Sequence, residues 1–124
     1  MTITKISSNK KPYALEERTF QFAKSLAIFC KKLPKTSSNI EYIKQVIRAS
    51  GSVGANYIEA NEALGKKDFL MRIKISRKEA KESAYWLRLI KETNLKDFEN
   101  EASNLFNEAV ELKKILSSIL VKSK

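Results

Sequence analysis

Apolar residues recur at every third or fourth position through separate segments of this 124-residue chain. This spacing places them along one side of an α-helix, so each segment predicts an amphipathic helix with one core-facing stripe. The predicted helices cover about residues 13–32, 40–64, 68–92 and 98–121. No stretch alternates apolar and polar residues as a half-buried strand would. The chain is therefore expected to be all-α, with a single domain over residues 1–124.

Residues that interrupt helices fall between these segments and set where each helix is expected to end. Pro34 stops the first helix, because the residue before a proline is pushed out of the α region, and residues 1–12 are expected to form a polar, frayed lead-in. Short connections between long amphipathic helices predict an antiparallel up-down-up-down four-helix bundle. The other expected ends are Ser38 or Asn39 as N-cap of the second helix, Gly65 as its stop, Asp68 and Asp97 as N-caps of the third and fourth helices, and Asn94 as the close of the third.

The middle of the second segment, Ala49–Ala55, is rich in small residues and contains Gly51 and Gly54. A glycine inside a helix costs about 1 kcal/mol relative to alanine. Close approach of a neighbouring backbone is the simplest compensation, and a loop at this position is the alternative. The expected core stripes include Ile47, Ser50, Gly54 and either Tyr57 or Ile58 in the second helix, and Leu112, Leu116 and Ile119 in the fourth.

Composition argues against most catalytic chemistry. The chain has no histidine, which removes the commonest general base and the commonest metal ligand. Its single cysteine, Cys30, excludes an intramolecular disulfide, suits a reducing compartment and is expected to be a small core or interface residue. No apolar run is long enough to span a bilayer, and the first residues lack a secretory signal. We therefore expect a cytoplasmic, non-enzymatic protein with no cofactor, no metal and no membrane partner.

Positive charge is concentrated on the third predicted helix. The chain has a formal net charge of +10, and residues 66–91 carry nine basic and three acidic side chains. Five residues of this segment recur at steps of 4, 3, 4 and 3, so they form one line on the helix, called here the basic row. The basic row consists of Lys74, Lys78, Lys81, Tyr85 and Arg88.

An aligned row of cations with an aromatic ring is typical of polyanion binding. The lysines and Arg88 are predicted to contact phosphates, with Arg48, Arg77 and Lys24 in support, while Tyr85 can stack on a base. A surface whose charges only favour solubility is the alternative. The same helix has a further apolar line outside its core stripe, which predicts a subunit interface formed by Met71, Ile75, Trp86 and Leu89.

Two of these helices also carry a family resemblance. The runs Ile47–Ala60, Lys66–Phe69 and Arg77–Leu87 resemble the bacterial four-helix-bundle proteins known as products of 23S rRNA intervening sequences. The resemblance implies a homopentamer. A branch of that family, the accessory variability determinants of diversity-generating retroelements, binds nucleic acid and a reverse transcriptase through a basic surface. The resemblance assigns no functional residue to this chain.

Two functions therefore remain open. The first is a basic oligomer that binds nucleic acid, RNA in preference to DNA, through the cationic face of the third helix. The second is a protein-interaction scaffold or accessory subunit, for example one that docks a reverse transcriptase. Binding of nucleic acid by the purified protein alone would distinguish the first from the second.

Overall fold

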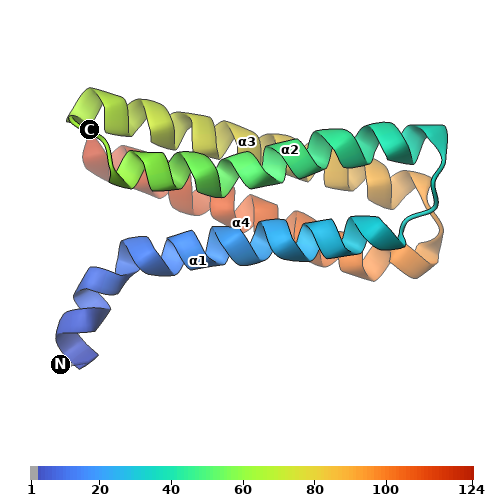
Figure 1. Cartoon of the computed structure of the whole chain (residues 1–124), viewed down its shortest axis with the longest axis horizontal. Helices are drawn as coiled ribbons and strands as arrows, with labels where there is room; N and C mark the ends of the chain where they lie inside the picture. Colours follow the sequence, from blue (N-terminus) through green and yellow to red (C-terminus); the bar gives the residue numbers. More distant parts are fainter. Residues whose placement is uncertain (1–2) are drawn as a thin grey trace.

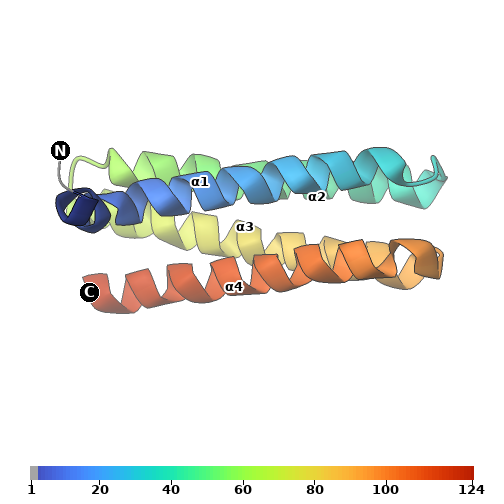
Figure 2. The same cartoon turned by 90° about the horizontal axis from the view of Figure 1, so that it is seen from below.

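The computed structural model describes the backbone of residues 3–124 and the side chains of residues 12–124. Successive helices run in opposite directions and pack along their lengths (Figure 1). α1 and α3 each pack against α2 and α4, which confirms the predicted antiparallel four-helix bundle (Figure 2). The helices are α1 (Ile3–Lys32), α2 (Ser37–Asn61), α3 (Lys66–Thr93) and α4 (Glu99–Ser123), with a short 3-10 helix, η1 (Lys96–Phe98), before α4.

The first helix begins earlier than predicted. The expected frayed lead-in is wrong from Ile3 onward, because α1 starts there and continues through Pro12; residues 1–2 lie outside the described residues. A proline inside a helix removes one backbone hydrogen bond and bends the axis. Pro12 is exposed, and the helix N-terminal to it turns away from the bundle axis (Figure 1). The proline is therefore accommodated by a bend and does not end the helix.

The loop between α1 and α2 is held by side-chain hydrogen bonds. Thr36 is the N-cap of α2 in place of the predicted Ser38 or Asn39, and its Oγ1 accepts the Asn39 backbone N–H at 3.1 Å. The Asn39 side chain is buried, where its Nδ2 donates to the Asn94 Oδ1 at 2.8 Å and to the Pro34 carbonyl at 2.9 Å. The Asn94 Nδ2 donates in return to the Asn39 Oδ1 at 2.9 Å. This amide pair ties the start of α2 to the end of α3.

The remaining helix ends agree only in part with those predicted from the sequence. Asn94 closes α3 as predicted. Gly65 is the N-cap of α3, whereas Asp68 lies inside its first turn. Asp97 lies within η1, and Phe98 takes the N-cap position of α4. An acidic residue in the first turn interacts favourably with the positive end of the helix dipole. Asp68 therefore still stabilises the start of α3, although it is not the N-cap.

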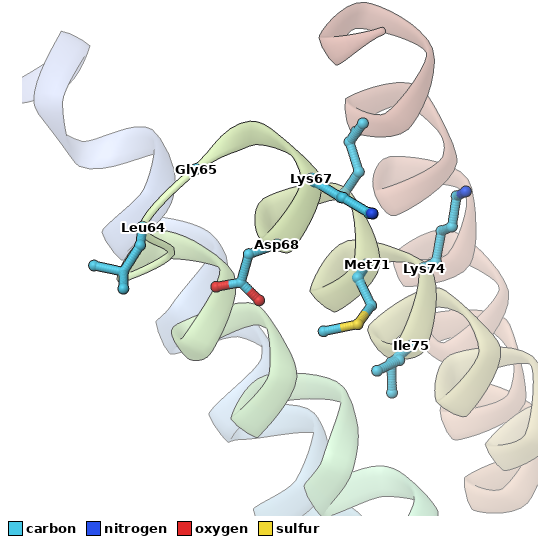
Figure 3. Close-up of a pocket in the computed structure, with 8 residues that line it drawn as sticks. Leu64, Gly65, Lys67, Asp68, Met71, Lys74 and Ile75 are labelled. Carbon is cyan, nitrogen blue, oxygen red and sulfur yellow. The ribbon is translucent and has the colours of Figure 1, made fainter.

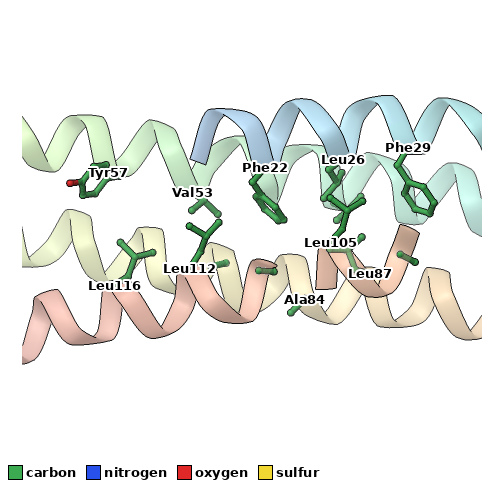
Figure 4. Packing of buried hydrophobic residues seen from close by; sticks show 14 of the residues in the cluster. Phe22, Leu26, Phe29, Val53, Tyr57, Ala84, Leu87, Leu105, Leu112 and Leu116 are labelled. Atoms are coloured by element: carbon green, nitrogen blue, oxygen red, sulfur yellow. The ribbon is translucent and has the colours of Figure 1, made fainter. Parts of the chain in front are cut away.

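One continuous apolar core runs along the bundle axis, and Phe22, Leu26 and Phe29 of α1 point into it (Figure 4). Most of the predicted stripes are buried. Two positions are corrected: Ile47 is 39% exposed while Val46 is fully buried, and Leu120 is buried in place of the half-buried Ile119. In both cases the end of the buried stripe steps by four residues, from Ser50 to Val46 and from Leu116 to Leu120, where the prediction stepped by three.

Small side chains let α3 approach its neighbours closely, and α3 packs more tightly against α2 and α4 than α1 does. Ala80 and Ser83 of α3 are fully buried, as is Ala109 of α4. Ser76 lies against α2, where its Oγ donates to the Val53 carbonyl at 2.7 Å. Buried hydroxyls are stable only when hydrogen-bonded, so this contact fixes the register of α3 against α2.

The two glycines of α2 have different surroundings. α2 is continuous through Ala49–Ala55, so the alternative of a loop is wrong. A Cβ on Gly54 would lie 2.8 Å from the Thr19 Oγ1, whereas a Cβ on Gly51 would meet nothing within 4 Å. The expected close approach is therefore confirmed at Gly54, where α1 crosses α2, and is absent at Gly51 within the described residues.

We expect opposite effects from alanine at these two glycines. Gly54→Ala should lower the free energy of unfolding by about 1–3 kcal/mol, because Thr19 is buried and its hydroxyl is hydrogen-bonded to the Glu16 carbonyl. Gly51→Ala should raise it by up to about 1 kcal/mol through helix propensity alone. Urea unfolding followed by circular dichroism measures both, and equal shifts in the two variants would contradict the assignment.

Candidate nucleic-acid interface

A shallow groove of about 350 Å³ runs between α3 and α4, and basic side chains dominate its lining. Four residues of α3 and two of α4 form it, and it is called here the basic groove. No carboxylate lines it. Its residues are Lys74, Arg77, Lys78 and Lys81 of α3, and Lys113 and Ser117 of α4.

Helix periodicity and helix packing together place these side chains. α3 buries Ile73, Ala80 and Leu87 in the core. The residues at steps of 3 and 4 from Lys74 then fall on its outer edge next to α4. Lys113 and Ser117 are one turn apart on α4, so they face the same groove from the other side. Three of the five members of the basic row, Lys74, Lys78 and Lys81, thus line one surface together with Arg77.

The cations of the basic groove are not neutralised by the protein. Among the side chains of residues 12–124, none of the five has a carboxylate oxygen within 4.0 Å. The ion pairs between helices lie elsewhere: Arg18–Glu108 and Lys32–Glu101 join α1 to α4, and Arg48 joins α2 to α3. Like charges concentrated along one groove produce a positive potential that attracts anions and is weakened by salt.

Arg48 does not belong to this surface. Its guanidinium lies 2.6 Å from the Glu82 Oε2 and 3.6 Å from the Glu79 Oε1, so the two α3 carboxylates compensate its charge. The predicted support of phosphate binding by Arg48 stays a prediction; in the bundle the residue lies outside the basic groove and connects α2 to α3. Lys24, the other predicted support outside α3, is exposed on α1, which packs mainly against α2 and α4.

Tyr85 and Arg88 continue the basic row beyond the groove. Both are exposed, and the Tyr85 side chain is 58% accessible although it is aromatic. The Tyr85 ring packs edge-on against Trp86, with ring centroids 5.2 Å apart and an interplanar angle of 76°. In the described part of the chain, Arg88 forms no ion pair with a carboxylate.

The predicted interface residues of α3 fall into two separate groups. Met71 is 47% exposed and Ile75 half-buried, and together with the fully exposed Leu64 they line an apolar depression of about 830 Å³ at the α2–α3 turn. In Figure 3 the Lys74 side chain extends toward α4, whereas the side chains of Met71 and Ile75 point away from α4. Trp86 packs instead against Tyr42 of α2, with centroids 6.0 Å apart.

Helix spacing in the sequence does not indicate the positions of Lys113, Ser117 or Leu64. Lys113 and Ser117 stand at helix spacing on α4, but spacing alone does not show which side of α4 faces α3. Leu64 was placed inside the second helix, whereas α2 ends at Asn61 and leaves Leu64 in the connecting turn. The sequence signal for an exposed Leu64 is its place directly before Gly65, where a helix is expected to end.

The remaining candidate chemistry is sparse. Cys30 is buried, and the loss of hydration raises the pKa of its thiol from 9.0 to about 11, so little reactive thiolate forms at neutral pH. Within residues 12–124 no group of three or more cysteine, aspartate or glutamate side chains is arranged to hold a metal ion. Over the same part of the chain, no helix combines the length and the apolar character that a membrane crossing requires.

The comparison with known families agrees with this architecture. A sequence model of the 23S rRNA-intervening sequence protein family matches residues 13–118. The chain belongs to this family. The matched range begins one residue after Pro12 and includes every residue of the basic groove.

A solved structure supports the fold. The chain is similar to a protein of unknown function from the S23 ribosomal protein family of Bacteroides thetaiotaomicron, with 30% sequence identity and a TM-score of 0.74. The match covers 85% of this chain and 96% of that protein. No curated protein matches the chain.

We expect Arg48→Gln to destabilise the bundle by about 1 kcal/mol, because it leaves the Glu79 carboxylate without its ion-pair partner. Glu79 is only 8% exposed, and its Oε1 accepts no hydrogen bond from the described residues. Lys44→Gln is the matched control, since Lys44 is exposed on the same helix and pairs with no described carboxylate. Thermal unfolding of both variants tests the assignment, and equal melting temperatures would contradict it.

Proposed function

We propose that this member of the 23S rRNA-intervening sequence protein family binds RNA, without catalysis, through the basic groove and the adjoining basic row. The observation that carries the proposal is the groove itself: five cations from two helices line one surface that contains no carboxylate. Ion pairs neutralise basic side chains at the α1–α4 and α2–α3 contacts, whereas no carboxylate of residues 12–124 pairs with the groove cations. An external polyanion is the partner that would best relieve this repulsion.

The chemistry of the groove fits a phosphate backbone. Lysine presents a compact charge that attracts a phosphate without a fixed geometry, whereas Arg77 can bind two phosphate oxygens at once. Such contacts set the position of a nucleic acid and carry little sequence information. The family's description favours RNA over DNA, since it refers to sequences inserted in ribosomal RNA.

We also propose that the protein acts as a homo-oligomer, as the family resemblance implies, with five copies. The apolar depression at Leu64, Met71 and Ile75 supports a contact between copies, because large apolar side chains are seldom left open to water in one place. Each additional copy would add one basic groove to the particle. Several weak phosphate contacts on one RNA would then combine into a stronger attachment.

A protein-interaction scaffold is the second candidate. The apolar depression lies next to the basic groove, and Lys74 lines both. Such a surface also suits an acidic protein, or a polymerase already bound to RNA, with reverse transcriptase as one example. In that case the purified protein would bind RNA weakly, and a protein partner would be needed to hold it in place.

The first test removes charge from the groove. We expect the triple variant Lys78→Gln, Lys81→Gln, Lys113→Gln to bind RNA more weakly, with a salt dependence whose slope falls by roughly 0.7 for each lost phosphate contact. Lys114→Gln is the control, since Lys114 neighbours Lys113 but pairs with Glu111 outside the groove. Fluorescence anisotropy over a salt series measures both, and unchanged binding by the triple variant would refute the proposal.

The second test concerns assembly. We expect the wild-type protein to form a particle five times the chain mass of 14.2 kDa, and Leu64→Glu with Met71→Glu to reduce that mass, because buried carboxylates would oppose the contact. Light scattering after size exclusion gives the mass. Ile58→Glu is the control, because Ile58 is 45% exposed on α2 and does not line the depression. Dissociation by the control alone would place the contact on another face.

A further inference from the structure

We propose that the site takes single-stranded RNA, and that Tyr85 is the platform on which one unpaired base stacks. The inference rests on the proposed function, since it assigns a class of RNA to the same surface. It starts from an aromatic ring that is 58% exposed in the middle of a line of cations. The Tyr85 side chain is outside the buried core, so core packing does not require a tyrosine at this position.

The position of Tyr85 matches the alternation of charge and base in a nucleic-acid strand. Tyr85 follows Lys81 by four residues and precedes Arg88 by three, so a cation lies on each side of the ring, at about 6 Å and about 4.5 Å along the helix axis. The basic groove begins at Lys81 and continues for two further turns toward Lys74. A strand whose phosphates follow this line would bring a base over the ring between two phosphate contacts.

The Tyr85 ring is held in place before any ligand arrives. It packs edge-on against Trp86 at 5.2 Å, and the Trp86 Nε1 donates to the Glu82 Oε2 at 3.2 Å. Trp86 also packs against Tyr42 at 6.0 Å. The same Glu82 Oε2 accepts from the Arg48 Nη2 at 2.6 Å. A ring fixed in this way loses little conformational freedom when a base stacks on it.

Only an unpaired strand can use both parts of this surface. In an RNA duplex the base faces are covered by their neighbours and the narrow major groove excludes side chains, so a duplex would meet the cations alone. Single strands expose base faces, and proteins that bind them combine a basic channel with stacked aromatic rings. An acidic peptide would likewise use the cations and leave Tyr85 without a role.

The experiment compares Tyr85→Ala with Tyr85→Phe on two probes, a fluorescein-labelled oligouridylate and a blunt RNA duplex of the same strand length. We expect Tyr85→Ala to lose about tenfold in affinity for the single strand and to keep the duplex affinity. Tyr85→Phe should retain both affinities, because stacking needs the ring and not the hydroxyl. Circular dichroism confirms the fold, which an exposed residue should not disturb.

A second readout is intrinsic to the chain. Trp86 is its single tryptophan and touches the Tyr85 ring, so stacking at Tyr85 should change tryptophan emission with the oligouridylate and not with the duplex. Equal losses on both probes, no loss with Tyr85→Ala, or equal wild-type affinity for both probes would overturn the inference. If the triple variant of Lys78, Lys81 and Lys113 still binds RNA more weakly after such a result, the proposed RNA binding stands and only the role of Tyr85 is refuted. If the triple variant binds RNA as the wild type does, both the RNA binding and the role of Tyr85 are refuted.

Discussion

The close packing of α3 between α2 and α4 is the constraint on which the rest of the structure depends. α3 packs against α2 on one side and against α4 on another, so only the rest of its surface can face solvent. Fully buried small residues, among them Ser76, Ala80 and Ser83, allow this approach. The basic row of α3 is then left on its remaining arc, where Lys74, Lys78 and Lys81 lie over the groove beside α4. Core packing therefore determines where the charge is displayed.

The distribution of ion pairs follows from the same arrangement. The contact of α1 with α4 is bridged by Arg18–Glu108 and Lys32–Glu101, and α2 is bridged to α3 through Arg48. α1 packs less closely, so these charged pairs add to its attachment. The α3–α4 contact is held by apolar packing and tolerates uncompensated cations at its edge. Any anion that binds only the folded bundle would stabilise it by mass action.

Helix spacing predicted the basic row because all of its members lie on one helix. The same reasoning could not find Lys113 and Ser117, since their approach depends on how α4 is rotated against α3. The ion pairs of Arg48 could not be predicted for a related reason: its partners Glu79 and Glu82 lie on another helix, and only the register of α2 against α3 brings them within reach. Properties of one helix were predictable, whereas properties shared by two helices required the tertiary structure.

Arg48 is also connected, through side-chain contacts, to the aromatic part of the proposed surface. Arg48 holds Glu82, Glu82 accepts a hydrogen bond from Trp86, and Trp86 supports the Tyr85 ring. This chain of contacts crosses from α2 to the outer face of α3. Loss of Arg48 would release the support of the ring without removing any groove cation. The α2–α3 contact therefore positions the aromatic part of the proposed surface, while the α3–α4 contact forms its charged part.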